Sequence, residues 1–382
     1  MEYRRIGKPD MMAGVIGLGG EHLDGKPYET VEEIIHTALD GGVTLMDLFM
    51  PGDTVRKNVG KALGSRRKEM MIQGHIGSCD LKEQYEVSRD LEVCKRYFEK
   101  LLLNLKTDYI DFGMLFFMDN ESALQKAEKN GIIDYALDLK RQGVIRAIGA
   151  SAHNPGAAGK LVDTGILDII LFSVNPVFDM TPCELDVLAK FDEDFGGYST
   201  VNFDPVRTDF YKKCARRNVS ISVMKTLAAG KLLDAKQSPF AKPMSVGQCI
   251  HYALGRPAVA SVLIGAANRG QMEEALRYIH LTDEEKDYTP MIQQARSDFK
   301  GKCLYCSHCQ PCPAAIDIAA VHRCLDIARL SPSNIPKKVL EDYEQLAAHG
   351  GDCLSCGNCE EKCPFSVSIM KNMDCAKELF GA

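Results

Sequence analysis

Short apolar runs rich in β-branched residues alternate with helical hydrophobic periodicity from residue 14 to about residue 280. The helical pattern is clear after the first run, where Val31, Ile34, Ile35, Ala38 and Leu39 fall at i, i+3, i+4, i+7 and i+8. The apolar runs predict eight strands, at residues 15–19, 43–47, 70–74, 109–115, 144–149, 169–174, 219–224 and 259–265.

These strands are continuously apolar, so both faces of their sheet must be covered. Eight strand–helix units over about 280 residues favour a (β/α)8 TIM barrel, and an open doubly wound sheet is the alternative. Residues 3–20 predict a hairpin that closes the bottom of the barrel. Gly17, Gly19 and Gly20 do not complete the G-x-G-x-x-G dinucleotide fingerprint, because residue 22 is His, so we interpret them as turn glycines.

The periodicity changes after residue 280, where polar helices lead into a cysteine-rich segment. We therefore predict two domains, a barrel over residues 1–300 and a mostly helical, ferredoxin-like domain over residues 301–382. Residues 178–205, which include Gly196 and Gly197, predict a long loop over one mouth of the barrel.

Composition narrows the choice of function. The formal net charge of −6 over 382 residues leaves no basic face for nucleic acid. The N-terminus lacks a signal-peptide pattern, and no stretch approaches the roughly 18 apolar residues of a membrane span. We therefore expect a cytoplasmic protein that binds neither nucleic acid nor a membrane. Ten of the fifteen cysteines lie between residues 303 and 382, and this crowding indicates metal ligation rather than disulfides.

The crowded cysteines form two runs. The first run, residues 303–312, is C-x2-C-x2-C-x2-C-P, and the second run, residues 353–363, is C-x2-C-x2-C-x3-C-P. Three closely spaced thiolates can bind three corners of a [4Fe-4S] cube, while the cysteine before Pro turns toward the other cluster. Zinc is the alternative, but zinc sites usually pair two separated C-x2-C knuckles. The spacing predicts two [4Fe-4S] clusters with crossed ligands, Cys303, Cys306, Cys309 and Cys363 on one and Cys353, Cys356, Cys359 and Cys312 on the other.

Several barrel segments resemble the aldo-keto reductase family, and they occur in the family's order. They are YRRIG near the start, GGVTLMD ending at Asp47, VGKAL, LKTDYIDFGML, GVIRAIGAS, and SVLIGA with QMEEAL. With its cysteine-rich tail, the chain resembles the bacterial branch of that family that carries ferredoxin-type clusters. The resemblance implies a (β/α)8 barrel, NADP(H) bound over its C-terminal mouth, and carbonyl reduction by an Asp, Tyr, Lys and His tetrad.

The sequence keeps one of the four tetrad residues. Asp47 matches the family Asp, whereas Gly52 stands at the Tyr position, His75 at the Lys position and Phe116 at the His position. Asp47 and His75 would end adjacent strands at the same face, near enough to hydrogen-bond. A carboxylate favours the imidazolium form, so His75 is the candidate proton donor, with a purely structural pair as the alternative. Further titratable side chains expected at this face are His22, His153 and Lys225.

The cofactor positions implied by the resemblance are only partly kept. Ser151 is kept, but Asn175 replaces the family Gln and Met224 replaces the ring-stacking Tyr. Ala152 and Ala275 replace two family Asn residues, and together these changes count against NADP(H). On the family's pattern, the candidate cofactor-binding residues are Ser151, Asn175, Met224, Lys225, Leu227, Gly230, Gly265 and Gln271.

Three functions stay open on this evidence. We favour an oxidoreductase in which the clusters exchange single electrons with a small-molecule substrate, or with a bound nicotinamide or flavin, in the barrel. A redox partner such as ferredoxin or flavodoxin would then be the external donor. The second is a non-redox lyase or isomerase with structural clusters. The third is an electron-transfer partner protein whose barrel is a docking scaffold and carries out no chemistry.

Overall fold

The computed structural model describes residues 1–7, 11–82, 84–180, 204–240, 242–295, 301, 303–330 and 332–381. These residues belong to two compact units. The barrel unit comprises Met1–Val174, Val219–Thr226 and Val259–His280, and the cysteine unit comprises Asn175–Asn218, Leu227–Ala258 and Leu281–Ala382. Most of the loop predicted at 178–205 lies outside the described residues, and the domain boundary near residue 300 stays a prediction.

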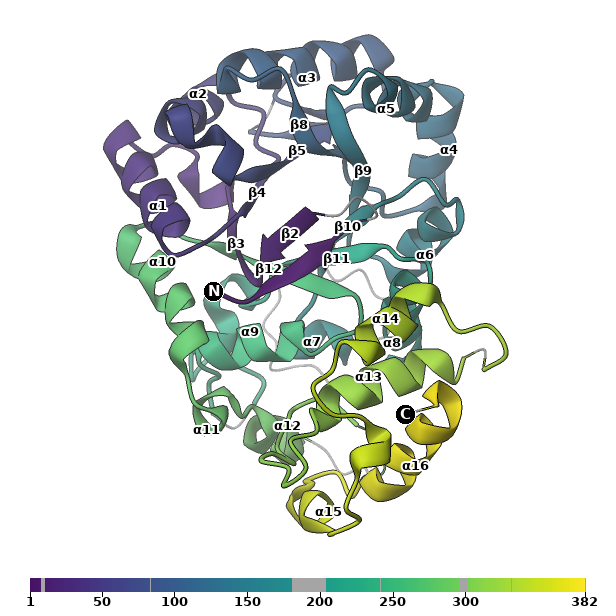
Figure 1. The fold of residues 1–382 in the computed structure, drawn as a ribbon. Helices are drawn as coiled ribbons and strands as arrows, with labels where there is room; N and C mark the ends of the chain where they lie inside the picture. The colour runs from purple at the N-terminus through teal and green to yellow at the C-terminus, as the bar shows by residue number, and fades with distance from the viewer. Residues whose placement is uncertain are drawn as a thin grey trace. The chain divides into compact units, whose positions relative to one another are not determined.

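The barrel unit is built on a closed ring of eight parallel strands (Figure 1). All eight predicted strands are present, and the open doubly wound sheet is excluded because the ring closes between β12 and β3. The strands are β3 (Ile16–Gly19), β4 (Leu45–Leu48), β5 (Met71–Ile76), β8 (Ile110–Leu115), β9 (Ile145–Ala152), β10 (Ile169–Ser173), β11 (Ser220–Met224) and β12 (Val259–Gly265).

Amphipathic helices follow the strands of this unit. The stripe predicted from residue 31 to residue 39 is buried, which confirms the helical pattern. Helix α3 shows how such a segment is delimited: the Asp90 side chain accepts a hydrogen bond from the backbone N–H of Val93 at 3.0 Å, and Lys106 ends the helix with a left-handed φ of 53°. The helices are α1 (Tyr28–Asp40), α2 (Asp53–Leu63), α3 (Leu91–Leu105), α4 (Glu121–Lys129), α5 (Ile132–Arg141), α6 (Pro155–Asp163) and α10 (Arg269–Leu276).

An antiparallel hairpin, β1 (Tyr3–Ile6) with β2 (Met11–Gly14), lies across the N-terminal end of the ring (Figure 1). The Gly7 N–H donates to Ser220 Oγ at 2.9 Å, and the Arg4 guanidinium donates to the Val259 carbonyl at 3.1 Å. Both acceptors begin strands, so the predicted plug is confirmed. The hairpin side chains Ile6, Met11 and Ala13 pack into the apolar lower interior of the barrel.

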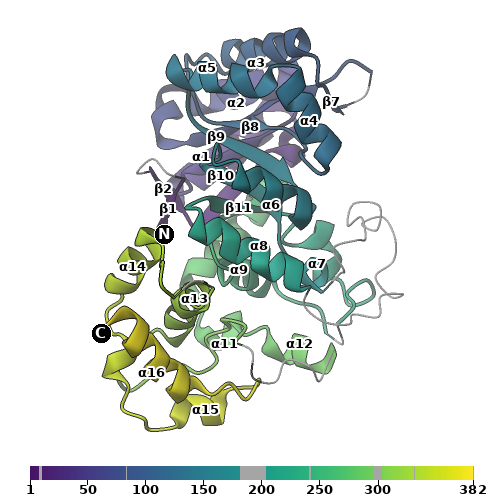
Figure 2. The same ribbon diagram turned by 90° about the vertical axis from the view of Figure 1, so that its right-hand side faces the viewer.

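The cysteine unit is helical over the described residues 303–381. Helix α13 packs against α14 and α16 (Figure 2). In the part of the chain that the structure describes, every helix is too short or too polar to cross a membrane. The helices of this unit are α7 (Pro176–Asp179), α8 (Pro205–Arg216), α9 (Val246–Leu254), α11 (Asp283–Lys286), α12 (Thr289–Ala295), α13 (Ile318–Ala328), α14 (Lys337–Glu344), α15 (Asn358–Lys362) and α16 (Ile369–Phe380).

Candidate functional site

Asp47 and His75 form a buried hydrogen-bonded pair near the C-terminal ends of β4 and β5. The strand register pairs Asp47 with Gln73, so His75, two residues further on, points to the same side of the sheet. His75 Nε2 lies 2.7 Å from Asp47 Oδ1, with side-chain exposures of 1% and 7%. The contact expected from the sequence is therefore present.

The second ring nitrogen of His75, Nδ1, is buried and makes no hydrogen bond among the described residues. A buried polar atom without a partner costs about 1–3 kcal/mol, so native structures keep one only where it serves a purpose or meets an unseen ligand. Nδ1 is therefore the atom of this pair whose hydrogen-bonding capacity is unused among the described residues.

Aromatic side chains surround His75. The Phe116 ring meets the imidazole edge-on, with centroids 5.2 Å apart, and Phe49 lies 6.1 Å away. Tyr85 packs edge-on against Phe49 at 5.2 Å. These rings exclude water, and a low local dielectric strengthens the hydrogen bond between His75 and Asp47.

A second Asp–His pair lies after β8 and β9. His153 Nδ1 is 2.9 Å from Asp119 Oδ2, and the backbone N–H groups of His153 and Asn154 donate to Asp119 Oδ1. Burial by itself would raise the pKa of Asp119, but the hydrogen bonds and charge of His153 outweigh it and lower the pKa. Phe117 lies 5.0 Å from the His153 ring and 5.6 Å from Phe116, so aromatic rings connect the two pairs.

The sequence anticipated only part of this second pair. His153 was expected at this face, but Asp119 was not singled out. Its signal was its position just beyond the C-terminal end of a barrel strand, where catalytic residues of this fold occur. Arg89 was also missed, and it donates to the carbonyls of Phe116 and Phe117 at 2.7 and 3.0 Å, which fixes the end of β8.

Two further side chains expected at this face are in the barrel unit. Lys225 follows β11 with a left-handed φ of 60°. Burial lowers the pKa of Lys225, and the nearby carboxylates of Glu21 and Asp119 partly counteract that shift. His22 lies against Gly265, where an added Cβ would come within 2.4 Å of the imidazole ring. Gly265 thus makes room for His22.

Two of the candidate cofactor residues in the barrel unit bond to their own chain. Ser151 Oγ accepts from the Phe117 N–H at 2.9 Å. The Gln271 side-chain oxygen accepts from the Ala267 N–H at 2.7 Å, just before α10. Met224 is half-buried and packs against the apolar barrel interior. The cofactor role of these residues stays a prediction.

The remaining candidate cofactor residues belong to the cysteine unit. Asn175 is buried, and its side-chain oxygen accepts from the Phe178 N–H at 2.9 Å, so it caps the start of α7. Asn followed by Pro is a helix-start signal, and it could have been recognised in the sequence. Leu227 precedes a short 3-10 segment, Ala228–Leu233, in which Gly230 has a φ of 87°.

The two cysteine runs share one backbone conformation. Two residues after the first cysteine of each run, Tyr305 and Ser355 are left-handed, and their N–H groups donate to Cys303 Sγ and Cys353 Sγ at 3.4 Å in both cases. A left-handed non-glycine residue costs about 1–2 kcal/mol, so a repeated pattern of them is a built feature. The other matching left-handed positions are Ser307 with Gly357 and Ala315 with Ser366.

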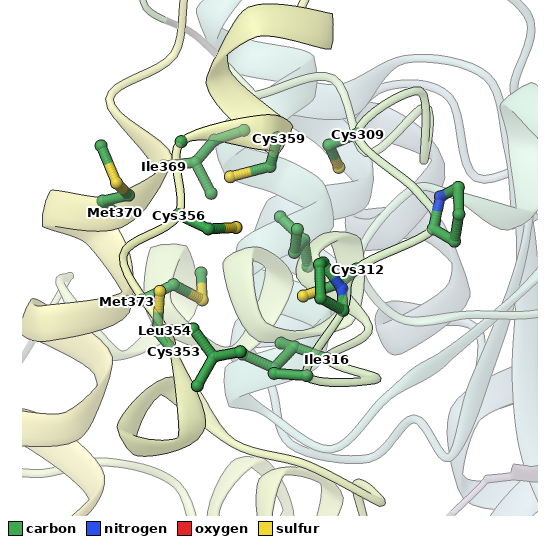
Figure 3. Close-up of a pocket in the computed structure, with 15 residues that line it drawn as sticks. Cys309, Cys312, Ile316, Cys353, Leu354, Cys356, Cys359, Ile369, Met370 and Met373 are labelled. Carbon is green, nitrogen blue, oxygen red and sulfur yellow. The ribbon is translucent and has the colours of Figure 1, made fainter.

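The cysteines line two cavities. The first cysteine pocket, about 320 Å³ including its open part, is lined by Cys303, Cys306, Cys309 and Cys363. The second cysteine pocket, about 390 Å³, is lined by Cys312, Cys353, Cys356 and Cys359, with Cys309 at its edge (Figure 3). Each pocket takes cysteines from both runs.

The arrangement in each pocket differs from a site for a single ion. Within the described ranges, no three His, Cys, Asp or Glu side chains converge closely enough to ligate one metal ion. In a [4Fe-4S] cube each thiolate binds a different iron atom, so its sulfur atoms stand farther apart than four ligands of one ion. Burial raises the pKa of Cys306 to about 11 and that of Cys309 to about 12.

The closed barrel, with two Asp–His pairs at the C-terminal ends of its strands, has the architecture of a (β/α)8 enzyme, and comparisons with known proteins identify its family. Residues 11–293 match the model of the Aldo/keto reductase family, so the chain belongs to that family and is an oxidoreductase. The uncharacterized oxidoreductase YqkF of Bacillus subtilis (strain 168) is 26% identical over 299 residues, which cover 75% of this chain and 94% of YqkF.

Solved structures show the same fold. The holo form of the aldo-keto reductase AKR11C1 from Bacillus halodurans is 20% identical, with a TM-score of 0.57 over 78% of this chain and 97% of its own. The glycerol dehydrogenase AKR11B4 from Gluconobacter oxydans is 18% identical, with a TM-score of 0.54 over 74% and 92%. Both cysteine runs, and all residues that line the two cysteine pockets, lie after the family match.

Proposed function

We propose that this family member is an iron-sulfur oxidoreductase, with two [4Fe-4S] clusters in its cysteine pockets and a small substrate at Asp47 and His75. The observation that carries the proposal is that each pocket combines cysteines from both runs. The ferredoxin-like domain would comprise residues 301–382 and the barrel domain residues 1–300. Free thiols at this density suit the cytoplasm, where disulfides are rare.

The residues around the pockets fit such clusters. At least four thiols line each cavity, and backbone N–H groups already point at Cys303 and Cys353. Hydrogen bonds to cluster sulfur atoms help to set reduction potentials. When bound, the two clusters would exchange single electrons with a donor or acceptor. We expect an external partner such as ferredoxin or flavodoxin.

The barrel face would handle the protons. Asp47 holds Nε2 of His75, which leaves Nδ1 to hold or deliver a proton at the substrate. Asp119 and His153 form a second proton-handling pair on the neighbouring strands. Reduction of a carbonyl or alkene consumes two electrons and two protons, so two pairs match the number of protons needed.

NADP(H) remains the cofactor that the family suggests. Ser151 and Gln271 already use their side-chain oxygens for hydrogen bonds within the chain, which supports an electron source other than NADP(H). Anaerobic titration with NADPH would separate the two sources. Bleaching of the visible cluster absorbance would favour NADPH, and bleaching only with a reduced one-electron carrier would favour the external partner.

Cluster content is tested by anaerobic purification with iron and sulfide analysis. We expect a brown protein with about eight irons and eight sulfides per chain. Cys363→Ala should lower iron content and alter the electron paramagnetic resonance (EPR) spectrum after reduction with dithionite. Cys375→Ala is the matched control, because Cys375 lies in α16 and lines neither pocket. A colourless protein, or one that contains zinc only, would refute the proposal.

A further inference from the structure

Arg256 is a buried cation without a carboxylate partner. It follows α9 and is 6% exposed, and within the described ranges no Asp or Glu lies at ion-pair distance from it. Its guanidinium donates to the Leu304 carbonyl and lies 3.3 Å from the Tyr288 hydroxyl. The rest of its surroundings are ring faces, with Tyr252 4.4 Å and Tyr305 5.4 Å from the guanidinium carbon.

The buried acid of this region is already paired with another arginine. Asp179 Oδ1 accepts from Arg207 Nε at 3.2 Å and from the Tyr211 hydroxyl at 2.5 Å. Asp179 Oδ2 accepts from the Tyr252 hydroxyl at 2.8 Å. Asp179 also attracts Arg256 through its charge, so among the described residues this one carboxylate serves two buried arginines. Two buried cations against one anion are costly unless a second counter-charge compensates them.

The groups that hold Arg256 belong to the first cysteine loop. Leu304 directly follows Cys303, and the Tyr288 hydroxyl also donates to the Leu304 carbonyl, at 2.9 Å. A [4Fe-4S] cube with four thiolates carries net negative charge, and the pocket of Cys303 would place that charge near Arg256. We propose that Arg256 is the buried counter-charge of the cluster in the first cysteine pocket, an inference that rests on the proposed function.

The second cysteine loop provides an internal comparison. Leu354 follows Cys353 as Leu304 follows Cys303, and both loops have the same left-handed residues. Leu304 is 6% exposed, whereas Leu354 is 66% exposed. Across the part of the chain that the structure describes, no arginine or lysine donates to the Leu354 carbonyl. The two loops thus have the same conformation, but over the described residues only the first cysteine loop has a buried cation bound to its carbonyl.

The consequence is a difference in reduction potential. Reduction adds one electron and no proton to the cluster, so the cluster becomes more negative by one charge. A fixed cation nearby favours that reduced state and raises the potential. Arg256 is here a positioning residue, because it acts on the cluster through its charge and through the Leu304 carbonyl.

The test is a potentiometric titration of the full, anaerobically purified chain, with dithionite as reductant and EPR as readout. Arg256→Gln removes the charge but keeps a donor for the Leu304 carbonyl. At fixed ambient potential, we expect the reduced-to-oxidised ratio of one cluster to fall about tenfold, equivalent to about 59 mV, while the other cluster is unchanged. Arg256→Lys keeps the charge and should restore most of the ratio.

Tyr288→Phe is the second control, since it removes a neutral donor from the same carbonyl and should shift the ratio less than Arg256→Gln. If Arg256→Gln instead loses about four irons and keeps the second cluster's signal, the counter-charge role is also supported. Eight retained irons with unchanged potentials, or equal shifts of both clusters, would overturn it. Absence of iron from the unmodified protein would instead refute the proposed function.

Discussion

Asp179→Asn should strongly destabilise the cysteine unit. The carboxylate is 2% exposed and accepts hydrogen bonds from Arg207, Tyr211 and Tyr252, which come from two different helices, α8 and α9. Arg207 itself is 1% exposed. The substitution removes the negative charge that lies 3.2 Å from the Arg207 guanidinium.

The size of the effect follows from the charge that remains. Removing one partner of a buried ion pair costs about 3–5 kcal/mol, because the other charge stays buried after its counter-charge is lost. Asn keeps one acceptor oxygen, so most of this cost comes from the lost charge and only about 1 kcal/mol of it from a lost hydrogen bond. We expect the free energy of unfolding to fall by about 3–5 kcal/mol, measured by urea unfolding followed by circular dichroism.

Two comparisons make this prediction specific. Asp138→Asn removes the carboxylate of an exposed pair with Arg141 and should change the free energy of unfolding by less than about 1 kcal/mol. In an Arg207→Met background the cost of Asp179→Asn should shrink, since the cation at ion-pair distance from Asp179 is then absent. A loss below about 1 kcal/mol, or the same loss in both backgrounds, would show that the reasoning is wrong.

Two further predictions concern titrating groups. Burial raises the pKa of Cys94 to about 11 and that of Cys249 to about 12, so at pH 8 at most about 0.1% of either side chain is thiolate. In the iron-free protein, iodoacetamide should therefore label the exposed Cys356 at least about 100-fold faster than Cys94 or Cys249. Similar rates in peptide mass spectrometry would contradict this. The pKa of Asp119 is lowered below 3.8, so its ion pair stabilises the fold above about pH 4, and this stability is lost as pH falls through the folded-state value. Asp119→Asn should flatten that part of the acid-unfolding curve, and an unchanged curve would count against the pair.

The amino-acid sequence alone was enough to predict the barrel and to recognise the two cysteine runs. Strand and helix periodicity is local, so eight strands and the buried stripe of α1 follow directly from the order of apolar residues. Cysteine spacing is also local, and it anticipated which cysteines share a pocket. The Asp47–His75 contact followed because both residues end neighbouring strands.

The tertiary structure decided what periodicity does not encode. Asp119 meets His153 across 34 residues, and Asp179 meets Tyr252 across 73, through loops and helix packing that no repeating pattern specifies. The same is true of Arg256, whose partner Leu304 lies 48 residues away. Asn175 and Gln271, for which cofactor binding stays a prediction, use their side-chain oxygens for hydrogen bonds near helix starts. A polar side chain takes whichever partner the folded backbone brings within hydrogen-bond reach, and that choice is made only when distant segments pack.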